Sequence, residues 1–147
     1  MKLTIEDIKN ISSIKEEPSW MLNFRLNSYK YFIESKEPDF GPNLNINYDS
    51  INYYKKREDH LTNDWNDISC EVRDVFDNLG VIQAEKKYLD GMGAQFDSEV
   101  IYHNMIKELV DKNVIFLDTD SALKKHPDII KKYFNKLVKY DENKITA

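Results

Sequence analysis

Residue types that commonly do chemistry are sparse in this 147-residue chain. There is one cysteine, Cys70, and the three histidines are His60, His103 and His126. A single cysteine excludes an intramolecular disulfide, and it excludes a zinc or iron-sulfur site built only from cysteines of one chain. Acidic neighbours such as Glu71 disfavour the thiolate form that accepts sulfur or binds metal. We therefore expect Cys70 to be inert, on the solvated side of a helix.

Two groups of residues have the side chains, but not the number or context, that a metal site needs. Glu99 and His103 are four residues apart and would share one face of a helix. Two ligands are too few, since closed sites need about four and catalytic sites about three. Asp118 and Asp120 carry oxygens suited to a hard cation, but no glycine-rich phosphate loop accompanies them, so helix capping is the expected use. We predict no metal-binding, cofactor-binding or catalytic residue in this chain.

The composition argues against several classes of protein. No nucleophile stands in a recognisable context with a base, so the chain is not expected to be an enzyme. The net charge of −5 argues against nucleic acid as a partner, since duplex binding relies on a clustered basic surface. No apolar run approaches the roughly 20 residues of a membrane span, and the acidic start does not resemble a signal peptide. We therefore expect a cytoplasmic protein.

The first third of the chain predicts two helices. Thr4 and Asp7 form a capping box for a helix that runs through Ile14 and ends before Pro18. Ser19 is positioned to cap a second helix that runs through about Ser35. Its apolar residues recur at helical spacing over a wide face, which predicts burial on two sides: Trp20, Met21, Phe24, Phe32, Leu22, Leu26, Tyr29 and Ile33.

The middle of the chain predicts less regular structure. Residues 36–47 form an irregular connection, with Phe40 and Leu44 as anchors. The Tyr-rich stretch 48–54 is compatible with a short helix or a short strand, and periodicity does not decide between them. Residues 55–64 are polar and predict a mobile linker. Tyrosines here suit a partner interface, and half-buried packing is the alternative.

The second half predicts further helices. Asn66 or Asp67 caps a helix that ends at Gly80, with apolar residues on one stripe: Ile68, Val72, Val75, Phe76 and Leu79. A helix over 83–90 then leads into a corner at Gly91 and Gly93, and Ser98 caps another helix through Lys112, with Asn113 as a left-handed terminator.

The final stretch predicts one short strand and a last helix. Val114–Leu117 is an apolar run with β-branched residues that is too short for a helix, so we expect a brief strand or an extended core segment there. Pro127 begins the last helix, with an apolar stripe of Ile129, Ile130, Tyr133, Phe134, Leu137 and Val138, and 141–147 is a loose tail. The expected fold is mainly α, a single irregular helical domain over 1–147 with about five to seven helices and at most one or two short strand segments.

Five stretches carry a resemblance to a known family. They are EEPSWMLNFRL (16–26), FGPNL (40–44), VFDNLGVIQAEKKYL (75–89), KKYLDGMGAQFDSEVIYHN (86–104) and NVIFLDTDSALKKHPDIIKKYF (113–134). Together they closely resemble the N-terminal region of SufB, the scaffold subunit of the SUF iron-sulfur cluster assembly machinery, in the SufB/SufD family. In that family this region precedes a long β-helix, so the resemblance implies a chain truncated before that core.

The resemblance implies a role in iron-sulfur cluster assembly through protein contacts. The implied partners are a SufC-type ATPase and a SufD-type subunit, through the full-length family protein, and sulfur-donor proteins. The resemblance places SufC docking in the later regions of that protein. The full-length family is associated with an iron-sulfur cluster, but its cluster residues belong to later regions, so none is carried over here. Two alternatives stay open. One is a free-standing helical interaction module without scaffold activity, and the other is a metal-binding dimer in which Cys70 and His103 are each supplied twice.

Overall fold

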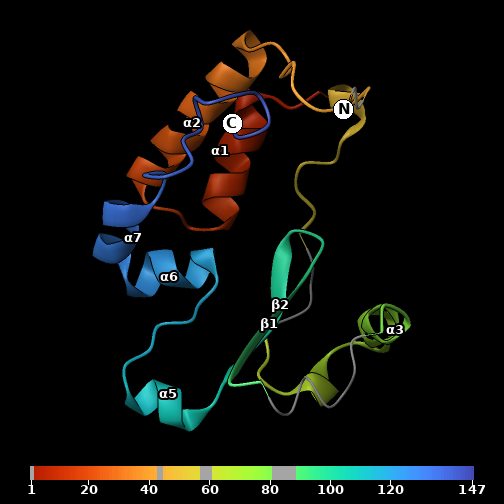
Figure 1. Ribbon diagram of the computed structural model, residues 1–147, viewed down its shortest axis with the longest axis vertical. Helices are drawn as coiled ribbons and strands as arrows, with labels where there is room; N and C mark the ends of the chain where they lie inside the picture. Colours follow the sequence, from red (N-terminus) through yellow and green to blue (C-terminus); the bar gives the residue numbers. More distant parts are fainter. Residues whose placement is uncertain (1, 43–44, 57–60, 81–88) are drawn as a thin grey trace. The chain divides into compact units, whose positions relative to one another are not determined.

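The computed structural model describes residues 2–42, 45–56, 61–80 and 89–147 (Figure 1). Within these ranges it contains six α-helices, two 3-10 helices and one two-stranded sheet, which confirms the mainly α class. Contacts between Cα atoms divide the chain into two compact units: unit 1 is Met1–Tyr53 with Thr119–Ala147, and unit 2 is Tyr54–Asp118. The single domain over 1–147 stays a prediction, and the two units are described separately.

Unit 1 begins with α1 (Ile5–Ile14) and α2 (Ser19–Glu34). The predicted capping box of α1 is confirmed, since Thr4 Oγ1 accepts from the Asp7 amide at 3.2 Å and Asp7 Oδ2 accepts from the Thr4 amide at 2.8 Å. The predicted cap of α2 at Ser19 is wrong. Pro18 is the N-cap residue, and its carbonyl accepts the first helical bond, from Met21 at 2.9 Å. The fixed φ of proline already sets the entry angle of this helix, so no side-chain cap is needed.

The C-terminal part of unit 1 contains α6 (Thr119–Lys125) and α7 (Pro127–Tyr133). The prediction that Pro127 begins a helix is confirmed. The predicted stripe through Leu137 and Val138 is wrong, because α7 ends at Tyr133 and Asn135 adopts a left-handed φ of 57°. Phe134 turns inward instead, with its ring 5.1 Å from that of Phe24 in α2.

The tyrosine-rich stretch and the last residues meet on α2. Tyr48–Ser50 forms a 3-10 helix, which decides between the two predicted alternatives in favour of a short helical turn. The Tyr48 ring lies 5.3 Å from that of Phe32. Lys144 Nζ donates to the Ser35 carbonyl at 3.1 Å and lies 4.8 Å from the Phe32 ring centroid. The sequence predicts a loose tail over 141–147. In the structure, Lys144 instead attaches this stretch to the C-terminal end of α2.

Unit 2 contains a 3-10 helix (Trp65–Asp67) followed by α3 (Cys70–Asn78). The predicted helix is confirmed, as is its end at Gly80, which has a φ of 78°. Its predicted cap is wrong, because Asn66 and Asp67 lie in the 3-10 helix and Ser69 is the N-cap residue. Val72 is fully buried, but Leu79 is 73% exposed because the helix ends one residue before it.

A β-hairpin replaces the predicted helical corner. β1 (Gly91–Phe96) pairs antiparallel with β2 (Glu99–Met105), and Asp97, with a φ of 53°, helps to make the turn. The glycines lie within the strand rather than in a turn. A Cβ on Gly91 would lie 3.1 Å from Phe116, so the glycine allows that ring to approach the backbone closely. The hairpin forms because it buries Ala94, Ile101 and Tyr102 against Ile68 and Val72 of the segment before it.

The segment after the hairpin also differs from the prediction. The predicted helix over Ser98–Lys112 is reduced to α5 (Lys107–Asp111), although Asn113 is confirmed as a left-handed residue with a φ of 58°. No strand forms over the predicted Val114–Leu117, and Val114, Ile115 and Phe116 are exposed, so the segment is not part of the core either. Leu44, His60 and positions 83–88 of the predicted helix over 83–90 lie outside the described residues, and Leu89 and Asp90 are not helical.

Candidate interaction site

A buried ion pair fixes the turn between α1 and α2. The Glu17 side chain is 1% exposed, and it accepts two hydrogen bonds from Arg25, at 2.7 Å from Nε and 2.6 Å from Nη2. The hydrogen bonds with Glu17 are the main reason that the pKa of Arg25 is raised. This fork-shaped geometry is the strongest form of ion pair that side chains make. It holds the start of α2 against the chain that leaves α1.

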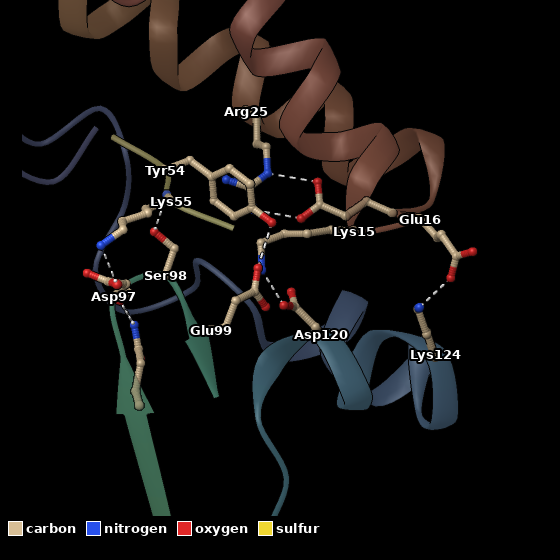
Figure 2. Close-up of polar contacts among 12 residues, drawn as sticks. Lys15, Glu16, Arg25, Tyr54, Lys55, Asp97, Ser98, Glu99, Asp120 and Lys124 are labelled. Atoms are coloured by element: carbon tan, nitrogen blue, oxygen red, sulfur yellow. Dashed lines mark hydrogen bonds and ion pairs between the residues drawn. The ribbon is translucent and has the colours of Figure 1, made fainter. Parts of the chain in front are cut away.

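Two more ion pairs join the same turn to α6 (Figure 2). Lys15 contacts Asp120, and Glu16 accepts from Lys124 at 2.6 Å. The hydrogen bond with Lys124 lowers the pKa of Glu16, and the same bond raises the pKa of Lys124. Asp120, for which the sequence predicts helix capping, lies within α6 and is used in an ion pair. The charges at this corner are mutually compensated, which suits a structural role.

A polar cluster in unit 2 holds the turn of the hairpin (Figure 2). The Tyr54 hydroxyl donates to Glu99 at 2.6 Å, the Lys55 amide donates to Ser98 Oγ at 2.9 Å, and Lys55 Nζ lies 3.0 Å from Asp97. Thr62 pairs with Tyr102 as an isolated bridge beside β2. Ser98 and Glu99 therefore bind the chain at Tyr54 and Lys55, and neither acts at a helix start as the sequence predicted.

The residues considered for metal or sulfur chemistry are separated. Cys70 is exposed as predicted, and Arg73 Nη2 lies 3.3 Å from its sulfur. The His103 ring is 4.9 Å from that of Phe116, and His103 Nε2 is buried with no hydrogen-bond partner in the described ranges. Among the described residues, no three His, Cys, Asp or Glu side chains gather as a metal site would require. One thiol with a guanidinium neighbour does not fit a cluster, so no step of cluster chemistry is assigned to this chain.

Large apolar side chains are exposed at many positions of the described chain, and two segments contain several each. In unit 1, Ile129, Tyr133, Leu137 and Val138 are 46%, 63%, 92% and 62% exposed; we call residues 129–138 the C-terminal apolar segment. In unit 2, the stretch from Ile106 to Phe116 also exposes Val110, Val114 and Ile115. Exposed apolar groups that gather on one segment are typical of surfaces that bind protein partners. The first segment contains residues of the apolar stripe that the sequence predicts for the last helix.

Unit 1 also contains a cavity that the sequence did not predict. It has a volume of about 390 Å³ and lies among α1, α2, the stretch around Tyr48–Tyr53 and the last residues of the chain. Its lining joins residues far apart in sequence, so no local motif could have revealed it.

None of the described helices is long and apolar enough to cross a membrane.

Comparison with known proteins gives one consistent result. The chain is 45% identical over 146 residues, 99% of its length, to an iron-sulfur cluster assembly SufBD family protein of Staphylococcus saprophyticus. The same identity and coverage relate it to proteins of that name in Staphylococcus haemolyticus and Staphylococcus aureus.

The match covers only part of each relative. The chain spans 31% of the length of each of these relatives. No family model and no solved structure matched the chain. Along nearly all of its own length, this chain is therefore similar to about one third of proteins named as SufBD family members in iron-sulfur cluster assembly.

Proposed function

We propose that this chain acts in iron-sulfur cluster assembly as the N-terminal helical part of a SufB-type scaffold. The observation that carries the proposal is the 45% identity over 99% of the chain to SufBD family proteins. The proposed role is contact within a cytoplasmic SufB-SufC-SufD complex and with sulfur-donor proteins, not catalysis, membrane attachment or nucleic-acid binding. In this proposal the cluster is held by other parts of the full-length protein.

The exposed C-terminal apolar segment supports a role in contact. Leu137 is 92% exposed, and burying a leucine side chain contributes about 1.5–3 kcal/mol. Since about 1.4 kcal/mol is a factor of ten in affinity, a partner that covers Leu137 gains at least about tenfold from this residue alone. The segment therefore offers a surface whose contribution to binding can be measured.

The test is capture of the partners by the whole chain. Purified chain is mixed with a SufC-type ATPase and a SufD-type subunit of the same organism, and their co-elution and affinity are measured. Leu137→Asp should weaken binding by at least about tenfold. Ile33→Asp is the matched control, because Ile33 is 46% exposed on α2, outside the C-terminal apolar segment. Equal loss in both variants, or no capture at all, would count against the proposal.

The alternative is a free-standing interaction module derived from the same family. The segments exposed in both units are compatible with it. The intact mass of the endogenous protein, detected with an antibody against this domain, separates the two functions. A product well above the 17.4 kDa of this chain supports the scaffold, and a product of that mass supports the free-standing module.

A further inference from the structure

The cavity of unit 1 has the size and the walls of a small-molecule site. Its volume of about 390 Å³ falls within the range of roughly 300–1,000 Å³ that is usual for ligand pockets. Ile8 and Ile11 of α1, Phe24 and Phe32 of α2, and Ile51 supply apolar walls. Such walls suit an alkyl chain, because burying apolar surface is favourable in proportion to its area.

Two hydroxyl groups of the lining have no hydrogen-bond partner among the described residues. Ser28 lies in the middle of α2 and is 5% exposed, and its Oγ is buried without a partner in the structure. The Tyr48 hydroxyl is likewise buried and has no partner in the part of the chain that the structure describes, and Tyr48 also borders a second cavity of unit 1. Burial raises the pKa of Tyr48, so its hydroxyl keeps its proton and can donate. Buried polar groups are nearly always satisfied by protein, ligand or water, so these two hydroxyls are available to bind a polar ligand atom in the cavity.

The charge of the lining favours an anion. Lys144 lies at the cavity, with its ammonium 4.8 Å from the Phe32 ring centroid and 5.2 Å from that of Tyr48. A lysine has three N–H donors, and the contact with Ser35 uses one of them. Arg25 also borders the cavity, although Glu17 compensates its charge. No acidic side chain occurs among the described residues that line it, although the charge of Glu37 acts on Tyr48 and the terminal residue Ala147 also borders the cavity.

From these observations we propose that the cavity of unit 1 binds a medium-chain fatty acid, with the alkyl chain among α1, α2 and Ile51. The carboxylate accepts hydrogen bonds from the hydroxyls of Ser28 and Tyr48 and from the ammonium of Lys144. This ligand matches each feature of the lining: an apolar body, acceptor oxygens and a negative charge. The proposal is independent of the role in cluster assembly.

The test uses calorimetric titration of the full chain with decanoate, below the concentration at which decanoate forms micelles. We expect saturable binding of one molecule per chain and at least tenfold weaker binding of decylamine, which has the same alkyl chain and the opposite charge. Lys144→Met should weaken decanoate binding about tenfold and narrow the preference over decylamine. Ser28→Ala should weaken it severalfold while preserving that preference. Lys136→Met is the matched control, because this exposed lysine does not line the cavity.

Each outcome has one meaning. Saturable binding that falls in Lys144→Met and Ser28→Ala but not in Lys136→Met supports the proposal. Absence of saturation, equal binding of decylamine, or equal loss in Lys136→Met overturns it. Circular dichroism of each variant reports folding, and chemical-shift changes of the Ser28 and Phe32 amides on adding decanoate give a second readout. A titration in which those two amides do not move also overturns the proposal.

Discussion

Replacing Arg25 by methionine tests how the α1–α2 turn is held together. The substitution keeps most of the apolar stem and removes the guanidinium that donates both hydrogen bonds to Glu17. Glu17 is then a carboxylate with a 1% exposed side chain and no compensating cation of its own. Removing one partner of a buried pair typically costs about 3–5 kcal/mol. Because the Arg25 side chain is 33% exposed, solvent screens part of the pair, and we expect the lower end, about 3 kcal/mol.

The assay is urea unfolding followed by the fluorescence of Trp20, which lies in α2, in a Trp65→Phe background so that unit 1 alone is reported. Lys124→Met is the matched control. It breaks the Glu16–Lys124 pair, whose side chains are 76% and 52% exposed, and exposed pairs contribute only about 0–1 kcal/mol. The double variant Glu17→Leu with Arg25→Met removes both charges and should recover most of the loss, since an apolar pair can replace a buried ion pair.

Two results would refute this reasoning. Arg25→Met could lower the free energy of unfolding no more than Lys124→Met does, which would mean that burial of Glu17 does not matter. Alternatively, the double variant could be no more stable than Arg25→Met alone. In that case the loss would come from packing of the arginine stem and not from an uncompensated carboxylate.

Three further predictions concern local structure. Thr4→Ala removes the side-chain acceptor of the α1 cap and should lower the free energy of unfolding of unit 1 by about 1 kcal/mol in urea titrations. Gly80→Ala should cost about 1–2 kcal/mol in unit 2, because φ is 78° there, whereas Gly93→Ala, with no positive φ and no atom closer than 3.9 Å to the new Cβ, should cost less. Hydrogen bonds from Thr4 lower the pKa of Asp7 from its ordinary 3.8. The Asp7 carboxylate therefore takes up a proton more readily in the unfolded chain than in the folded one. The stability that Asp7 supplies is lost as the pH falls below about 4. Asp7→Asn should flatten that acid limb in unfolding curves measured at a series of pH values; an unchanged limb would show that the carboxylate of Asp7 does not contribute.

The sequence by itself determined the features that depend on a few neighbouring residues. The capping box of Thr4 and Asp7, the start of α7 at Pro127 and the left-handed ends at Gly80 and Asn113 are all where their residue types predict. Each involves bonds or backbone angles within about one helical turn, so the local sequence contains the information. The same holds for the solvated position of Cys70.

The hairpin was decided by tertiary structure. The apolar residues Ile101, Tyr102, Met105, Ile106 and Leu109 fit a helical stripe, which is why the sequence predicts a helix there. In the structure, Ile101 and Tyr102 pack against α3 while β1 supplies hydrogen bonds along β2, and these distant contacts outweigh the local pattern. Strand propensity depends strongly on such cross-strand packing, which a single stretch of sequence does not contain.

The candidate sites were also decided by tertiary structure. Burial of Glu17 depends on Arg25, which is eight residues further along the chain. The cavity depends on Ser28, Tyr48 and Lys144 meeting across the length of unit 1. Local sequence determines helix ends because their bonds are local, but a cavity or a buried charge exists only when distant segments exclude water together.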